Sequence, residues 1–212
     1  MRIIAFLFFI VIATACVAQS HTFVFLNSRK DKAELPKEEL DKLMDAHLKN
    51  IERLAKEGKL IVAGPFDGGG GIFIMNTPSV ELANQWIGTD PAIQANRWRI
   101  EVLPYQPRIG SVCAAKETSE MVSYSFVRFL PNIHKETVGK YAENLALHDE
   151  YIKKLSKTEP IIAEGFFGQD GNIMIINGEI SPELIENDPG VKGGAFLFEI
   201  KKVWVAKGSF CE

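Results

Sequence analysis

The sequence lacks most of the short motifs that assign a chemistry at once. It holds three cysteines in 212 residues and contains no CxxC, HExxH or GxSxG pattern, so no zinc centre, metalloprotease or serine hydrolase is indicated. The run Gly68–Gly71 has no P-loop lysine and opens no helix, which argues against phosphate binding. The net charge is −3 and the charges are interspersed, so no basic stripe recommends nucleic acid as a partner. No metal ligand set and no low-complexity segment is predicted.

A long apolar run occurs at the amino terminus. Arg2 is followed by about a dozen uninterrupted apolar residues and then by small ones, a pattern typical of a secretory signal and too short for a membrane span. We predict a signal peptide over residues 1–18, with no transmembrane span after its removal. Cleavage after Ala18 would release a secreted or periplasmic protein. Cleavage before Cys16 would instead give a lipoprotein anchored through that cysteine, but Ala13 stands where a lipobox usually has leucine, so the soluble product is favoured.

The rest of the chain contains an internal sequence repeat, in which one unit occurs twice. HLKNIERLAKEGKLIVAGPF, from His47 to Phe66, returns as HDEYIKKLSKTEPIIAEGFF from His148 to Phe167. His47 and His148 stand 101 positions apart. Further matching pairs are Ile51/Ile152, Leu54/Leu155, Gly64/Gly165, Asn76/Asn177, Asp90/Asp188, Glu101/Glu199 and Cys113/Cys211. An internal repeat of this length indicates two copies of one structural unit.

Each copy is predicted to have the order β-α-β-β-α-β. In the first, strands over 22–27, 60–63, 72–75 and 98–103 alternate with helices over 37–57 and 78–87, the longer of which carries apolar residues at helical spacing. Asp90-Pro91 is expected to break the chain. In the second, strands are expected at 122–129, 161–163, 172–176 and 195–205, with helices at 135–156 and 181–186. This order is the split βαβ motif of ferredoxin-like folds.

A ferredoxin-like unit covers one face of its sheet with helices and leaves the other face bare, and a second copy can bury that face. The predicted fold is therefore α+β: two tandem ferredoxin-like (βαββαβ) modules packed sheet-to-sheet as an internal pseudo-dimer. Module 1 spans 19–112, a polar linker spans 113–120, and the more degenerate module 2 spans 121–212. The sequence says nothing about further oligomerisation.

Cys113 and Cys211 occupy equivalent places at the exits of the two repeats. An oxidising compartment would allow them to form a disulfide, provided that the pseudo-twofold arrangement brings the two exits together. Two unpaired thiols are the alternative.

The candidate site residues follow from the repeated helix. His47 lies between Met44 and Ile51 at helical spacing, on the face that packs against the sheet. A lone histidine there is often only a hydrogen-bonded core residue. Its functional interpretation is that a carboxylate, Asp67 or Asp90, orients the imidazole for general acid–base work. Each carboxylate also has a structural explanation, Asp67 as a hairpin-loop residue and Asp90 as a turn start.

The second copy offers His148 and Asp188 as a weaker counterpart of the same pair. It has Gly165-Phe166 where the first copy has Gly64-Pro65, and Gly168 where the first has Asp67. The three tryptophans, Trp86, Trp98 and Trp204, are expected to fill the core or the space between the repeats.

Residues 22–105 resemble the YCII (YciI-like) domain family of the dimeric α/β-barrel superfamily. The resemblance rests on the combination of His47, Gly58, Ala63-Gly64-Pro65 with Asp67 beyond it, Asp90-Pro91 and Glu101. It implies a ferredoxin-like fold and a His–Asp active site in a small cleft. A few relatives are linked to dehalogenation of chlorinated ring-cleavage or hydroquinone compounds, so lyase- or dehalogenase-like chemistry on a small organic molecule is one expectation.

Two other expectations remain open beside that enzyme. The protein could bind a small molecule without reacting with it, or it could have a structural role in the periplasm. Related barrels bind haem through a histidine, but His47 lies in no haem-specific motif, and no cofactor is predicted.

Overall fold

The computed structural model describes residues 21–116, 118–134 and 138–211. The predicted signal peptide over 1–18, including Cys16, lies outside the described residues.

The first half of the chain contains β1 (His21–Ser28), α1 (Lys37–Lys56), β2 (Leu60–Pro65), β3 (Gly71–Met75), α2 (Val80–Ile87), α3 (Pro91–Gln94) and β4 (Trp98–Ile109). Helix α1 begins after Pro36, and acidic residues in its first turn and basic residues in its last turn favour its dipole. Gly58, at a φ of 67°, lets the chain leave this helix for β2. The Ser79 side chain accepts a hydrogen bond from the Leu82 N–H and caps α2.

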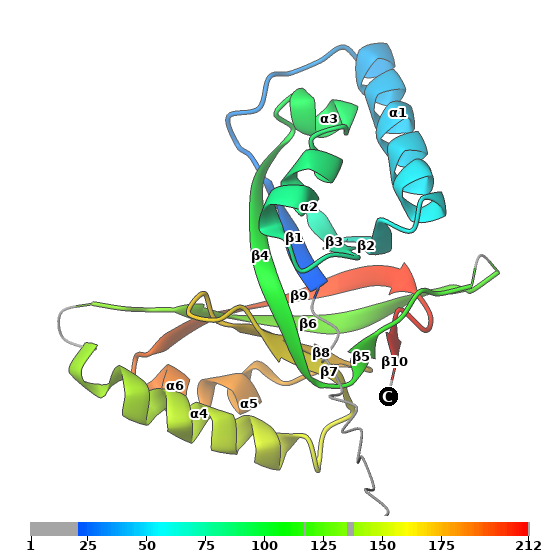
Figure 1. Ribbon diagram of the computed structural model, residues 1–212. Coiled ribbons are helices and arrows are strands. Elements are labelled where there is room, and N and C mark those ends of the chain that lie inside the picture. Colours follow the sequence, from blue (N-terminus) through cyan, green and yellow to red (C-terminus); the bar gives the residue numbers. More distant parts are fainter. Residues whose placement is uncertain (1–20, 117, 135–137, 212) are drawn as a thin grey trace, which may run out of the picture.

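The second half repeats this order. It contains β5 (Ser111–Val112), β6 (Met121–Pro131), the 3₁₀ turn η1 (Val138–Lys140), α4 (Tyr141–Leu155), β7 (Ile161–Phe166), β8 (Asn172–Ile176), α5 (Pro182–Glu186), α6 (Pro189–Lys192), β9 (Phe196–Ala206) and β10 (Phe210–Cys211). Both halves thus place a long helix after their first strand and a pair of short helices before their last long strand. Figure 1 shows α1–α3 on one side of the strands and α4–α6 on the opposite side.

Eight strands form one sheet in the order β2-β3-β1-β4-β7-β8-β6-β9, with antiparallel pairing throughout. Pairing of β4 with β7 joins the two halves at one seam. At the other seam, Phe66 forms an isolated antiparallel bridge with Val203, and the Asp67 N–H donates to the Lys202 carbonyl at 3.0 Å. The sheet therefore curls until β2 meets β9.

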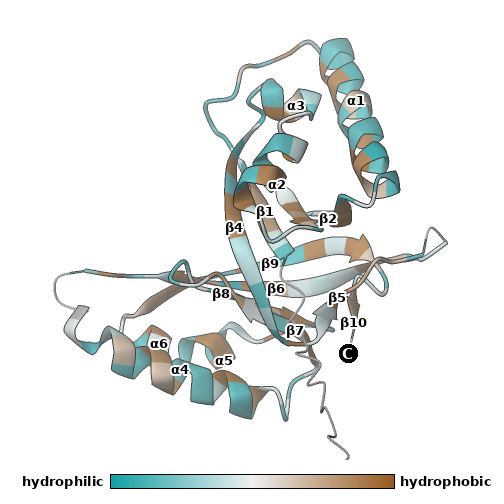
Figure 2. Ribbon diagram, in the orientation of Figure 1, coloured by the Kyte–Doolittle hydropathy of each residue, from teal (hydrophilic) through white to brown (hydrophobic). Residues whose placement is uncertain are grey.

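Side-chain alternation divides the core into three layers. Phe23 and Phe25 point into a central apolar cluster that both halves share, with Phe126 and Phe167 from the second half. The intervening Val24 and Leu26 point outward to a cluster beneath α1 and α2. A matching outer cluster lies beneath α4 and α5. Figure 2 shows hydrophobic and hydrophilic residues mixed along the strands, as expected where successive side chains face different surroundings, and long helices α1 and α4 that also carry both kinds.

Three expected boundaries differ from the structure. Strand β4 runs to Ile109 rather than stopping at Leu103, because its second half pairs with β7 across the seam. Asp90-Pro91 does not simply break the chain, since Asp90 caps the short helix α3. The α-helix expected from Lys135 begins at Tyr141, after the turn η1, while 135–137 lie outside the described residues.

The two chain exits lie together. β5 pairs with β10, and Cys113 and Cys211 form a disulfide with a Cα–Cα distance of 6.0 Å across 98 positions of sequence. Within the described part of the chain, no helix is long and apolar enough to cross a membrane.

Candidate functional site: a histidine–aspartate pair beside an apolar cleft

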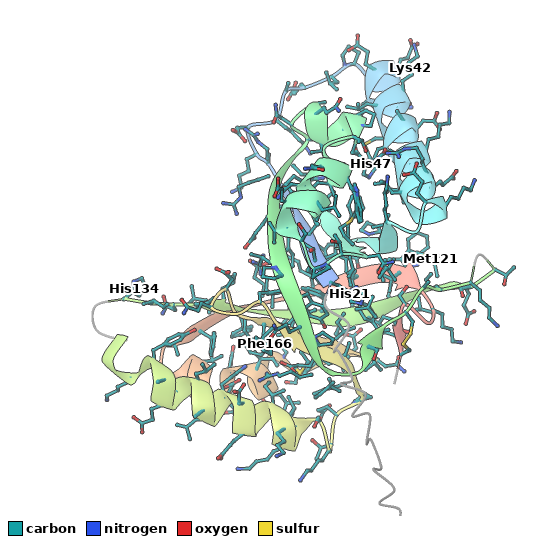
Figure 3. All side chains as sticks on the ribbon, in the orientation of Figure 1. His21, Lys42, His47, Met121, His134 and Phe166 are labelled. Atoms are coloured by element: carbon teal, nitrogen blue, oxygen red, sulfur yellow. A yellow bond between two sulfur atoms is a disulfide. The ribbon has the colours of Figure 1, made fainter. Side chains whose placement is uncertain are left out.

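His47 lies on the inner face of α1, where its side chain is 8% exposed. Its ring centre is 4.9 Å from that of Trp98 on β4 and 6.0 Å from that of Phe73 on β3. The helical spacing that placed His47 against the sheet in the sequence is the spacing that holds the imidazole between these aromatic rings. Figure 3 shows His47 in the space between α1 and the rest of the first half.

Asp90 is the carboxylate that reaches this histidine. Its Oδ2 lies 2.8 Å from His47 Nδ1, and its Oδ1 accepts hydrogen bonds from the N–H groups of Ala92 and Ile93 at the start of α3. Asn50, one turn beyond His47 on α1, donates to the same Oδ2 at 3.2 Å. The side chain of Asp90 is fully buried, so its position is fixed on every side.

This arrangement selects one tautomer of the imidazole. An ionised carboxylate can only accept hydrogen bonds, so Nδ1 of His47 carries the proton that Asp90 accepts. The Nε2 atom is then left with its lone pair, and no described residue forms a hydrogen bond with it. His47 can therefore accept a proton through Nε2 while Asp90 holds the ring in place.

Asp67, the other carboxylate that the sequence left open, lies elsewhere. It is an exposed residue on the turn between β2 and β3, and its backbone N–H pairs with Lys202 of β9. It does not line the cleft at His47 and has no contact with that ring among the described interactions. The structure thus brings together His47 and Asp90, and leaves Asp67 at the seam.

A cleft of about 640 Å³ lies next to His47, between α1 and the sheet. Its polar side chains are His47, Ser28 and Lys32. The glycine turn Gly68–Gly71 forms one end of it, and the remaining walls are almost all apolar: Leu26, Met44, Leu48, Ile51, Ile72, Phe73, Trp98, Met121 and Trp204. Pockets for small organic ligands typically have this composition, with few polar groups on largely hydrophobic walls.

Trp204 was expected to fill the core or the space between repeats; it lies where the two halves meet, but on the surface rather than in the core. Its side chain is 48% exposed and borders the cleft. Strand alternation explains this, because Val203 and Val205 take the inward positions on β9 and direct Trp204 outward. Sequence reasoning also missed Asn50; the signal for it was a polar residue one turn from His47 on an apolar face.

The second half contains the corresponding pair in a closed form. His148 Nδ1 lies 2.5 Å from Asp188 Oδ2, and Asp188 Oδ1 accepts from the Gly190 N–H at 2.7 Å. His148 is fully buried, its ring packs against Phe129 and Phe196 at 4.8 and 4.7 Å, and its Nε2 is sealed without a hydrogen-bond partner among the described residues.

Polar substitutions fill the space that is open in the first half. Glu164 stands 101 positions after Ala63, and Asp149 stands 101 after Leu48. Arg108 of β4 binds both carboxylates, with two bonds to Glu164 and one to Asp149 at 2.7 Å. These hydrogen bonds, chiefly those to Glu164, raise the pKa of Arg108 above its already high usual range. The remaining cavity at His148 measures about 210 Å³.

The fold class is that of a dimeric α/β barrel, here with both halves in one chain. A mutant chlorite dismutase from Candidatus Nitrospira defluvii in complex with cyanide superposes with a TM-score of 0.53 at 9% identity, covering 88% of this chain and 91% of its own. An anthrone oxidase-like protein gives a TM-score of 0.50 at 10% identity, covering 89% and 92%. The predicted α+β fold of ferredoxin-like modules is confirmed.

The sequence comparison is narrower than the structural one. Residues 22–105 match the model of the YCII-related domain, which is the part of the chain that holds β1 to β4 and the His47–Asp90 pair. No curated protein matches the chain significantly.

The residues around this site include few groups that could hold a metal or a haem. The described part of the chain has no cluster of three or more His, Cys, Asp or Glu side chains that could hold a metal ion. Haem carries two carboxylates, and Lys32 is the only lysine or arginine that borders the cleft to receive them.

Proposed function

We propose that the protein is an exported enzyme that moves a proton on a small, largely apolar organic molecule, with His47 as the acid–base group and Asp90 as its positioning residue. The observation that carries this proposal is the fixed Nδ1–Asp90 hydrogen bond on one side of the imidazole with the cleft on the other. We further propose that the second half is a diverged copy of the first, whose own histidine no longer meets a ligand.

The chemistry follows from the placement of His47. Nε2 would take a proton from an acidic C–H or O–H of the bound molecule and return it to another atom, as in an isomerisation, or to a leaving group, as in an elimination. Asp90 would stabilise the imidazolium formed in between, because its buried carboxylate keeps its hydrogen bond to Nδ1 in both states. The apolar walls would exclude water, which strengthens that interaction.

Export is supported by two features. The apolar run in residues 1–18 has the length and flanks of a secretory signal. The disulfide between Cys113 and Cys211 is a bond that persists in oxidising compartments and is rare in the reducing cytoplasm. Secretion or release into a periplasm fits both.

The test is proton exchange catalysed on a probe, because the natural substrate is undefined. The apolar ketone 2-indanone has acidic C–H groups beside its carbonyl, and their replacement by deuterium in D₂O can be followed by NMR. We expect the His47→Gln variant to lose about 10²-fold or more of the protein-catalysed rate, as for a general base. The His148→Gln variant is the matched control and should keep the full rate.

Each alternative has its own result. Equal rates for wild type and the His47→Gln variant would refute the catalytic role of His47. Binding of 2-indanone without any exchange above buffer would indicate a non-catalytic binding module. Neither binding nor exchange, with a lower melting temperature for the His47→Gln variant, would indicate that the histidine has only a structural role.

A further inference from the structure

The cleft at His47 is not built by the first half alone. Strand β9 of the second half runs along β2, and its outward-facing side chains therefore lie beside the outer surface of the first half, next to α1. Trp204 is one of these outward residues. Met121, at the start of β6, pairs with Ala206 of the same strand and also borders the cleft. Figure 3 shows Met121 near the carboxyl end of α1.

The rim of this cleft exposes a large apolar surface. Trp204 is 48% exposed, Met121 is 40% exposed, and Leu48 of α1 is 56% exposed, and all three border the same cleft. Exposed large apolar side chains that gather around one concavity mark a place where an apolar surface is covered during function. Two of the three come from the second half.

The symmetry-related position in the other half shows that this feature is specific. Trp204 O lies against Gly64, and in the same way Gln106 O lies against Gly165, so Gln106 of β4 is the structural counterpart of Trp204. Gln106 is polar and is not among the residues that line the cavity at His148, which receives Arg108 from the same strand instead. The aromatic residues that line the cavity at His148 (Tyr141, Phe166 and Phe196) all belong to the second half itself, whereas the His47 cleft has an aromatic side chain supplied by the opposite half.

We infer that Trp204, supplied by the second half, is a specificity-determining residue of the His47 site and selects flat ligands of bicyclic aromatic size. The indole would contact the face of the ligand that extends beyond Trp98 and His47, with Met121 and Leu48 covering its edge. This inference rests on the ligand site of the proposed function, but not on its proton transfer.

The test uses two phenols that differ in size. We expect 1-naphthol to bind wild type more tightly than phenol in isothermal titration calorimetry. The Trp204→Ala variant should raise the Kd of 1-naphthol about tenfold, as expected for loss of one aromatic contact with its buried area. The Kd of phenol should change less than about threefold. Trp204→Phe keeps a ring and should restore most of the affinity. Gln106→Ala is the matched control and should bind as wild type does.

The outcomes separate this inference from the proposed function. An unchanged Kd of 1-naphthol in a folded Trp204→Ala variant would overturn the inference, and so would the absence of any binding of both phenols to wild type at millimolar concentration. A weaker Kd in Trp204→Ala together with no effect of His47→Gln on 2-indanone exchange would support the inference while the catalytic role of His47 fails.

Discussion

Gly64 lies on β2 at the seam where that strand runs beside β9, and we predict that its replacement by alanine opens the barrel. A Cβ atom at this position would be 2.5 Å from the carbonyl oxygen of Trp204, and still closer to Cγ1 of Val205. Neither neighbour can easily move aside, because Val205 is fully buried in the central core and the other contact is backbone. The two strands must therefore separate.

The expected cost is a loss of about 2–4 kcal/mol in the free energy of unfolding. Overpacking of a well-filled core costs about 1–3 kcal/mol. Separation of β2 from β9 also weakens the hydrogen bond from the Asp67 N–H to the Lys202 carbonyl, at about 1 kcal/mol. Because Trp204 belongs to the same seam, the variant should also weaken 1-naphthol binding.

Urea unfolding of the mature, oxidised chain measures this cost. Gly165→Ala tests the other seam, where a Cβ would meet the Tyr105 ring at 2.5 Å and the Gln106 carbonyl oxygen at 2.6 Å, so a similar loss is expected. Gly139→Ala is the control, because no atom lies within 4 Å of its Cβ. If Gly64→Ala unfolds at the same urea concentration as wild type, the close approach of β2 and β9 is not a constraint and the reasoning fails.

Three further predictions concern the disulfide, the carboxylate and pH. Replacing Cys113 and Cys211 by serine should cost about 4–5 kcal/mol by loop entropy, and reducing agent should destabilise wild type but not this variant in the same unfolding assay. Asp90→Ala removes the α3 cap and the partner of His47, so a loss of about 3 kcal/mol is expected; a loss below 1 kcal/mol would contradict the buried network. Burial lowers the pKa of His21 below its ordinary 6.5, so below about pH 6.5 the unfolded chain binds a proton that the folded chain does not, and stability falls as pH falls. In urea unfolding, the loss of stability between pH 7 and pH 5 should therefore be smaller for His21→Gln than for wild type. An equal loss in both proteins would refute this role of His21.

The repeat made the fold predictable from sequence. Each βαββαβ half has one apolar sheet face that must be covered, so few arrangements of the two halves are possible. Alternation along β1 also correctly separates the inward Phe23 and Phe25 from the outward Val24 and Leu26. What the pattern could not show was how the seams close. Pairing of β4 with β7 depends on contacts between residues far apart in sequence, and nothing local marks residues 104–109 as strand.

The candidate site was predictable only in part. Helical spacing placed His47 on the inner face of α1, but the choice between Asp67 and Asp90 required the position of α3. Asp90 has two local roles at once, since one carboxylate oxygen caps α3 and the other orients the histidine. The Asp-Pro motif indicates the first role, as a helix or turn start, but gives no sign of the second. The position of Trp204 beside the cleft depends on how β2 and β9 meet, and no local sequence pattern predicts it.

The proposal that the second half is a diverged copy of the first also accounts for the difference between the two clefts. Each cleft is walled by the last long strand of the other half: β9 supplies Trp204 to the His47 cleft, and β4 supplies Arg108 to the His148 cavity. In a homodimer of identical modules, any residue at such a position would appear in both clefts, so a side chain that fills one cleft would also fill the other. A single chain separates the two positions. Arg108 can then close the cavity at His148, where Glu164 and Asp149 bind it, while the His47 cleft stays open behind an aromatic wall.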